Sequence, residues 1–409
     1  MNIHKAYKTE LDPTVPQQVL LVKHADTARF AWNWGLARRI EEYKLTGKSS
    51  NAIEQHRQLN ALKRTDFPWM YEVSKCAPQA ALQDIDKAFK NFWAKRARYP
   101  KFKSRYRAPY TFRLNGSIRV EPSRMKLPRI GWLRLKESGY LPLNAKINSA
   151  TVREQAGRWF VSIQVEEEIV VPENQGPAVG LDLGLKSFVA GSDGLTLEAP
   201  KPLLHSLKRL RILSRRHSRK EKGSTNRKKS ALRLAKLHYR IGCQRKDFLH
   251  KATSDLAKNK SVIVVEDLNV SGMVKNRHLS RSISDAGWSE FVRQLEYKAS
   301  WYGSTVTKAD RFFPSTKTCS GCGTVKDEMP LSERTYHCDR CGLILDRDVN
   351  ASRNLLSLST GSSSGFEACG DLPLGESMKQ EPSIVAWENG YVQTYRTTCQ
   401  IDSRVSGYV

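Results

Sequence analysis

Three carboxylates occur in sequence contexts from which they could act together on a phosphodiester. Asp182 lies in VGLDLGL, Glu266 ends the run SVIVVE, and Asp348 lies in DRDVNASRN. Hard divalent cations such as Mg²⁺ prefer carboxylate oxygens as ligands. Two such ions about 3.5–4 Å apart can activate a water molecule and stabilise the leaving oxygen in phosphodiester hydrolysis. These residues are therefore candidates for a two-metal nuclease site.

The local sequence predicts how these carboxylates are positioned. In VGLDLGL, strand alternation sends Val179 and Leu181 to one face and Asp182, with its flanking glycines, to the other. VIVVE is typical of a strand buried on both faces, and Glu266 stands at its carboxyl end, where open α/β sheets place their sites. Asp348 begins a predicted helix, whose N-terminal dipole favours an anion.

Two neighbouring acids compete for the same roles. Asp267 follows Glu266 directly, and Asp346 precedes Asp348 by two residues. Strand alternation favours Glu266 over Asp267, since Glu266 shares a face with Val262. Spacing alone also leaves the simpler alternative that each acid is a solvated or helix-capping residue.

Four of the eight cysteines form the pattern C-x₂-C-x₁₅-C-x₂-C, namely Cys319, Cys322, Cys338 and Cys341. Two such pairs supply four thiolates for tetrahedral Zn²⁺, with redox dithiols as the alternative. A four-cysteine site leaves no open coordination position, which predicts a structural zinc and not a catalytic one. We interpret His337, beside Cys338, as a bystander.

The composition predicts a polyanionic partner. Lysine and arginine total 68 against 41 acidic residues, a formal net charge of +27, and nucleic acid is the leading candidate. The stretch YPKFKSRYR at 99–107 is either a solvated connector or a strip that grips phosphates and stacks on bases. Its candidate nucleic-acid contacts are Tyr99, Lys101, Lys103 and Arg105.

The sequence predicts no membrane segment. It has no apolar run of about 18 residues and no signal-peptide pattern. The four cysteines outside the paired motif are scattered, which is typical of reduced cytosolic thiols. We therefore expect a cytoplasmic protein.

The first half of the chain predicts one edge strand, three helices and then a small sheet. The edge strand covers residues 3–12, and a helical period begins near Pro16 and continues in three stretches to about residue 97. Short alternating runs separated by turn residues at 110–168 predict an antiparallel sheet or barrel, which the first strand can complete.

The second half predicts a nuclease-like alternation of strands and helices. Strands are expected at 178–191 and around Glu266, and long basic helices at 201–258 with a mobile hairpin tip. A basic loop at 270–286 precedes a helix over roughly 288–302. The residues STGSSSG indicate a linker, and the segment after them a flexible tail.

These motifs together resemble those of the TnpB family. The resemblance rests on GLDLGLKSF, VVEDLNVSGMVKNRHLSRSISDAGW, the cysteine pairs and DRDVNASRNL, and it extends to about residue 358. TnpB proteins are RNA-guided nucleases of bacterial and archaeal insertion sequences, related to compact type V CRISPR effectors. One departure is Ser352, where the family commonly has alanine.

The resemblance implies an α+β multidomain protein with a catalytic domain of the RNase H-like (RuvC) α/β fold and an inserted zinc ribbon. The implied parts are a wedge β-barrel (1–15 and 105–170), a helical recognition lobe (16–104), the nuclease domain (175–315 and 345–358), the zinc ribbon (316–344) and a flexible tail (359–409). The basic loop at 270–286 resembles the lid that gates the active site.

The resemblance also implies the function and its partners. Asp182, Glu266 and Asp348 become the Mg²⁺-binding catalytic residues, with the family's DxN pattern favouring Asp348 over its rival. Lys75 and Gln79, four residues apart, match residues that read the base edges of a short flanking motif. The implied partners are a guide RNA from the transposon end and double-stranded target DNA, bound by a monomer in the nucleoid.

Two alternative functions stay open at this point. A guide-RNA-dependent repressor would bind DNA without cutting it, but nuclease-dead relatives have lost a carboxylate and this chain retains all three. A zinc-ribbon protein that binds DNA without a guide is the other alternative.

Overall fold

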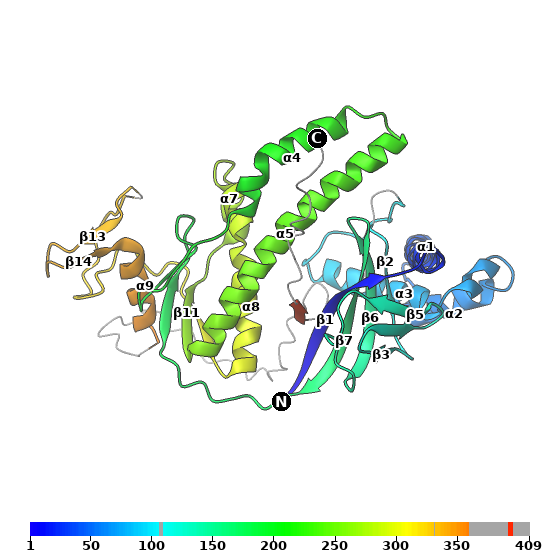
Figure 1. Cartoon of the computed structure of the whole chain (residues 1–409), viewed down its shortest axis with the longest axis horizontal. Coiled ribbons are helices and arrows are strands. Elements are labelled where there is room, and N and C mark those ends of the chain that lie inside the picture. The colour runs from blue at the N-terminus through cyan, green and yellow to red at the C-terminus, as the bar shows by residue number, and fades with distance from the viewer. Residues whose placement is uncertain (106–108, 331, 360–391, 396–409) are drawn as a thin grey trace. The chain divides into compact units, whose positions relative to one another are not determined.

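The chain folds into two compact units in the computed structural model (Figure 1). The structure describes residues 1–105, 109–330, 332–359 and 392–395. The first unit contains residues 2–168 and the second begins at Ile169. The finer division into wedge, recognition lobe, nuclease domain and zinc ribbon stays a prediction. The tail predicted at 359–409 lies outside the described residues except for Ser359 and a short strand.

The sheet of the first unit is antiparallel along its main path, β2-β6-β7-β1-β5-β4-β3. Among the described residues its end strands β2 and β3 do not pair with each other, so the ladder does not close into the barrel that was one expectation. The strands are β1 (Asn2–Asp12), β2 (Thr111–Leu114), β3 (Arg119–Glu121), β4 (Arg124–Leu127), β5 (Gly131–Leu135), β6 (Lys146–Gln155) and β7 (Arg158–Glu168), and β15 (Val392–Tyr395) pairs in parallel with β1.

The prediction that residues 3–12 form an edge strand is wrong. β1 pairs with β7 over most of its length, and at its end Leu11 and Asp12 pair with β5. Only Ile3, Ala6, Thr9 and Leu11 of the strand are buried, without strict alternation, a pattern that does not distinguish an edge strand from an interior one. The end strand β2 is instead covered by a helix, where Arg113 forms an ion pair with Asp84 at 2.8 Å.

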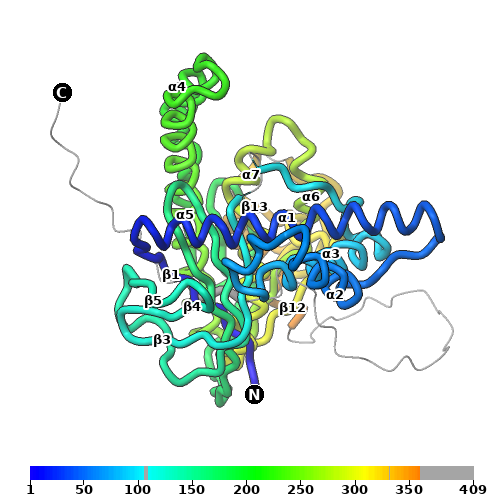
Figure 2. Tube along the Cα trace, turned by 90° about the vertical axis from the view of Figure 1, so that its right-hand side faces the viewer, coloured from blue at the N-terminus to red at the C-terminus, as the bar shows by residue number. Residues whose placement is uncertain are grey.

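The helices of the first unit form as the sequence predicts, with small shifts in their ends. They are α1 (Val15–Thr46), α2 (Ala52–Leu62), the 3₁₀ turn η1 (Pro68–Glu72) and α3 (Cys76–Trp93). Figure 2 shows α1 as one unbroken helix. It ends at Gly47, whose φ of 68° suits a left-handed cap. Asn51 caps α2 through its bonds to the Ile53 and Glu54 amides.

A five-stranded mixed sheet forms the centre of the second unit, in the order β10-β9-β8-β11-β12. β8, β11 and β12 are parallel, and β9 and β10 are antiparallel to their neighbours. The strands are β8 (Val179–Asp182), β9 (Val189–Gly191), β10 (Thr196–Leu197), β11 (Val262–Glu266) and β12 (Thr305–Ala309).

Helices cover both faces of this sheet. The covering helices are α5 (Thr225–Asn259), α8 (Trp288–Tyr302) and α9 (Arg347–Ser357), whereas α4 (Pro202–Ser218) packs against α5. α5 and α8 lie side by side (Figure 1) and bury Leu256 and Leu295 against Leu181 on one face. α9 packs on the other face, where Leu355 contacts Val264.

The loop predicted at 270–286 contains two short helices, α6 (Val270–Met273) and α7 (Ser280–Ala286). Asp285 at the end of α7 is 7% exposed and accepts a 2.6 Å bond from Arg245 of α5. Its carboxylate also accepts from the amides of Leu203 and Leu204 at the start of α4. The segment is therefore anchored to α4 and α5 at its C-terminal end.

Gly180 of β8 permits the close approach of α9. A Cβ atom at this position would lie 2.0 Å from the Ser352 carbonyl oxygen and 2.7 Å from the Leu356 amide nitrogen. These are backbone atoms, so the helix itself would have to move. Gly180, two residues before Asp182, therefore makes room for α9.

We expect Gly180→Ala to destabilise the second unit by about 1–3 kcal/mol or more, because it overpacks a helix–sheet contact. Gly242→Ala is the matched control, since a Cβ there meets nothing within 4 Å on α5. It should be neutral or stabilising by about 0.4–1 kcal/mol. Thermal melting of the two variants checks this, and equal melting temperatures would contradict it.

Candidate functional site

The sheet brings Asp182 and Glu266 to one edge. Each is the last residue of its strand, and β8 and β11 are parallel neighbours in which Leu181 pairs with Val265. Asp348 lies in the first turn of α9, which packs on β8. Two adjacent strand ends and one helix start thus gather the three acids that the sequence analysis selected.

Burial and neighbouring negative charges raise the pKa of both Asp182 and Glu266. Burial, followed by the negative charges of Glu266 and Asp348, raises the pKa of Asp182 to about 8, against a smaller opposing effect of Arg347. Burial also raises the pKa of Glu266, partly opposed by a hydrogen bond from Ser315. A divalent cation would relieve both effects, and the donors are the hard oxygens that Mg²⁺ prefers.

Arginines supply positive charge beside the third acid. Arg347 donates from Nη2 to the Asp348 carboxylate at 3.2 Å, and Arg334 lies 3.9 Å from it. Among the described residues, the three carboxylates do not come close enough together to form a ligand group for a single ion, as the cysteines do. Ligands of two separate ions need not converge that closely.

The two rival acids have other partners. Asp267 forms an ion pair with Arg311 on the surface. Asp346 caps α9, because its carboxylate accepts from the amides of Asp348 at 2.9 Å and Val349 at 3.2 Å. These contacts support the preference for Glu266 and Asp348, whose catalytic role stays a proposal.

The four cysteines converge on one point. Their sulfur atoms all lie within 4.8 Å of one another, in a ribbon with strands β13 (Thr335–His337) and β14 (Ile344–Asp346). Gly323 and Gly342 take φ angles of 73° and 72°, which allows each knuckle to turn. The ring of His337 faces Asp339 and is not part of this group. Such a cluster is compatible with zinc.

Lys75 and Gln79 lie at the start of α3. Lys75 is the exposed N-cap residue and Gln79 a half-buried residue of the first turn. The charge of Lys75 adds to burial in lowering the pKa of Lys63 and of His56. Lys75 and Lys63 therefore place two positive charges near the start of α3.

The 99–105 strip is held against the helices of the first unit. Trp32 donates to the Lys101 carbonyl at 3.0 Å, and Asn33 bonds to both the amide and the carbonyl of Lys103. The Lys103 ammonium lies 3.7 Å from the centre of the Trp32 ring. Tyr99 packs edge-on against Phe92, 5.3 Å between ring centres. The strip is therefore anchored to the helices, and its role in nucleic-acid binding stays a prediction. The remainder of the predicted stretch, 106–107, lies outside the described residues.

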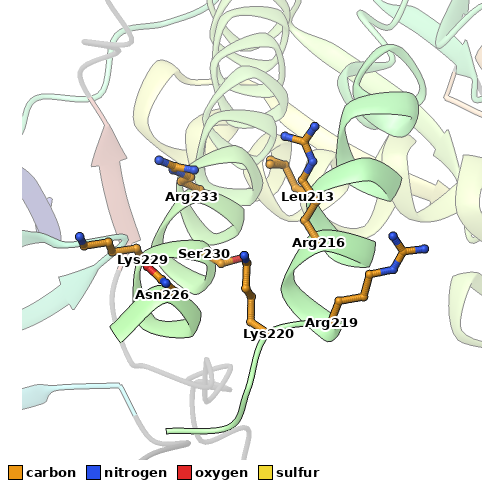
Figure 3. A pocket seen from close by; sticks show the side chains of 8 residues that line it. All are labelled: Leu213, Arg216, Arg219, Lys220, Asn226, Lys229, Ser230 and Arg233. Atoms are coloured by element: carbon orange, nitrogen blue, oxygen red, sulfur yellow. The ribbon is translucent and has the colours of Figure 1, made fainter. Parts of the chain in front are cut away.

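A basic cleft lies where the sequence predicted only a mobile hairpin tip. It occupies about 490 Å³ between the end of α4 and the start of α5 (Figure 3). Its lining residues are mostly cationic, namely Arg216, Arg219, Lys220, Lys229 and Arg233 with Leu213, Asn226 and Ser230. Arg227 closes the tip by donating to the carbonyls of His217 and Lys220. The basic run RRHSRKEKGSTNRKK was the sequence feature from which this cleft could have been predicted.

The described residues therefore define a mixed α/β protein that combines an acidic site at a sheet edge with a four-cysteine site. None of the described helices combines the length and apolar character of a membrane-spanning segment.

Comparisons with known proteins agree with this class. Family models match residues 160–277 ("Probable transposase"), 288–355 ("Cas12f1-like, TNB domain") and 1–48 ("Helix-turn-helix domain"). A Streptomyces pristinaespiralis protein named "Putative RNA-guided DNA endonuclease" is 37% identical, covering 94% of this chain and 96% of its own. An Escherichia coli K12 protein, "Putative RNA-guided DNA endonuclease InsQ", is 33% identical and covers 93% of this chain and 97% of its own.

The similarity over nearly the whole length shows that the chain belongs to the TnpB family. A solved Cas12f1–sgRNA–target DNA complex shares the fold, with a TM-score of 0.51 at 15% identity over 83% of this chain and 84% of that one. Residues 1–48, all of them described, form one strand and the single helix α1, so no helix-turn-helix forms there.

We expect the metal-free chain to lose stability as pH rises, because the folded-state pKa of Asp182 exceeds the unfolded value of about 3.9. Between those values the native state binds more protons than the unfolded chain, so this contribution to the free energy of unfolding falls toward pH 8. Asp182→Asn should melt higher than the wild type at pH 8.5, by about 2–4 °C per kcal/mol of repulsion relieved. At pH 5 the gap should be smaller.

Added Mg²⁺ should raise the melting temperature of the wild type at pH 8.5 more than that of Asp182→Asn. Differential scanning fluorimetry at both pH values measures these shifts. A difference between the variants that is independent of pH would contradict the assigned repulsion.

Proposed function

We propose that this protein is an RNA-guided DNA endonuclease of a transposable element, which cleaves target DNA beside a short flanking motif by two-metal phosphodiester hydrolysis. The observation that carries the proposal is the burial of Asp182 against Glu266 and Asp348 at the edge of a mixed sheet. The names of the relatives at 33–37% identity support the same activity.

Each carboxylate has a distinct position in the proposed mechanism. Asp182, Glu266 and Asp348 would hold Mg²⁺, which when bound supplies an activated water and stabilises the leaving oxygen. Asp182, whose pKa is raised by burial and by the charges of the other two acids, would hold the ions together with them. Arg347 and Arg334 lie beside Asp348 and can neutralise a scissile phosphate that approaches it.

The four cysteines would hold a structural zinc ion. Four thiolates would complete the tetrahedral shell that zinc prefers and leave no position for a substrate, so the ribbon would act by its shape and charge.

The proposed nucleic-acid partners are a guide RNA from the transposon end and double-stranded target DNA. Lys75 and Gln79 would read the flanking motif, and Tyr99, Lys101 and Arg105 would contact the nucleic-acid backbone or bases. Lys103 would act more weakly, since its ammonium is engaged with Trp32. The basic cleft of the α4–α5 hairpin would bind phosphates of the guide RNA.

Asp182→Ala should reduce guide-dependent cleavage by about a thousandfold or more, since it removes several kcal/mol of metal-mediated stabilisation. Binding of the co-purified RNA should not change. The assay uses the complex co-expressed with the DNA downstream of its gene, and matched targets with a randomised flank in Mg²⁺. Asp267→Ala is the matched control, because that acid is paired with Arg311.

Cutting that persists in Asp182→Ala would overturn the nuclease proposal. Guide-dependent binding without cutting by the wild type would favour the repressor. Absence of bound RNA would favour the guide-free DNA-binding protein.

Lys229→Gln with Arg233→Gln should weaken RNA binding and lower the slope of log affinity against log salt by about 0.7–0.9 for each phosphate that the double variant no longer neutralises. Lys251→Gln is the control on the same helix, since Lys251 is paired with Asp247. Filter binding at several salt concentrations measures the slope. An unchanged slope in the double variant would exclude the cleft from RNA binding.

A further inference from the structure

A chain of hydrogen bonds connects the cysteine cluster to the carboxylate site through α9. The segment 315–320 leads from the sheet into the first cysteine knuckle, and Cys319 within it is 1% exposed. Two amide side chains of α9, Asn350 and Asn354, face this segment and are 0% and 4% exposed. Buried amides are normally satisfied by hydrogen bonds, so their partners matter.

Both amides bind the backbone of that segment. Asn350 donates from Nδ2 to the Thr318 carbonyl at 2.7 Å and accepts from the Ser320 amide at 2.9 Å. Asn354 donates from Nδ2 to the carbonyls of Ser315 at 2.7 Å and Thr318 at 2.6 Å. The backbone is therefore held on both sides of the first zinc-ligand cysteine by the helix that also carries Asp348.

The segment in turn contacts a carboxylate of the acidic site. Ser315 is 3% exposed, and its hydroxyl donates to Oε1 of Glu266 at 2.8 Å. A hydrogen bond to an ionised carboxylate is short and directional, so it sets the rotation of the carboxylate plane. Asn354 fixes the Ser315 backbone, and Ser315 fixes Glu266.

We propose that Ser315, Asn350 and Asn354 couple the two metal sites, so that the folded cysteine knuckle holds Ser315 in the position that orients Glu266 for divalent-cation binding. The inference rests on the proposed function in taking Glu266 as a ligand of the divalent cation and the four cysteines as ligands of zinc. The three are positioning residues, since each acts through a ligand and not on the substrate. Loss of such supporting partners typically weakens metal affinity about 10–100-fold.

The direct test measures Mn²⁺ binding to the full chain by electron paramagnetic resonance of the free ion, without RNA or DNA. Ser315→Ala should weaken Mn²⁺ binding at least about 10-fold with its zinc content unchanged. Ser352→Ala is the matched control: it also removes a fully buried hydroxyl, which donates at 2.8 Å within α9 to the Val349 carbonyl. It should bind Mn²⁺ as the wild type does.

The coupling itself is tested by removing zinc with a thiol-reactive mercurial and a chelator. Zinc removal should weaken Mn²⁺ binding in the wild type and have little further effect in Ser315→Ala, because the connection is already broken. Asn350→Ala offers the same test with the thiolates intact. It should weaken Mn²⁺ binding although Asn350 bonds to Thr318 and Ser320 and not to a carboxylate.

Unchanged Mn²⁺ affinity in Ser315→Ala, or equal weakening by zinc removal in both proteins, would overturn the coupling. The proposed function can fail separately. If the wild type and variants show the predicted Mn²⁺ pattern but the wild type shows no guided cleavage, the coupling is supported and the proposed nuclease activity is contradicted. If the wild type cuts DNA and Ser315→Ala binds Mn²⁺ normally, only the proposed coupling is contradicted.

Discussion

The repulsion among three carboxylates that share a partly dehydrated sheet edge is the constraint on which the second unit depends. Burial first, and then the charges of two negative neighbours, raise the pKa of Asp182 to about 8. Such a cluster is unfavourable for a free chain at neutral pH and favourable for one that binds divalent cations. The surrounding structure must therefore hold the acids together against their own charge.

The helix α9 contributes much of the packing that holds the acids together. It approaches β8 closely because Gly180 has no side chain, and Leu355 anchors it to β11 through Val264. Its first turn carries Asp348 and the buried amide of Asn350, and the following turn carries the buried amide of Asn354. One short helix thus supplies a site acid, a sheet contact and the attachment of the cysteine ribbon. A single displacement of α9 would disturb all three.

Positive charge is distributed over several surfaces with different local structure. The aromatic and basic strip is fixed to α1 by backbone bonds and by the contact of Lys103 with Trp32. The α4–α5 cleft presents five cations around a tip closed by Arg227. Lys75 lies at a helix start near Lys63. A polyanion as long as a guide RNA can engage such separate sites, which a small anion cannot.

The sequence by itself determined which residues could do the chemistry. The cysteine spacing predicted the four-sulfur cluster, and β-branched runs with glycine-flanked acids predicted strands that end in carboxylates, since these are local properties of the chain. Tertiary structure decided the rest. The interior position of β1, the engagement of Asp267 with Arg311 and Asp346 with the α9 amides, and the path from Asn354 through Ser315 to Glu266 all join residues by contacts that local pattern does not encode. Periodicity reports which face of an element is buried, whereas the partner of that face is chosen only when distant segments pack.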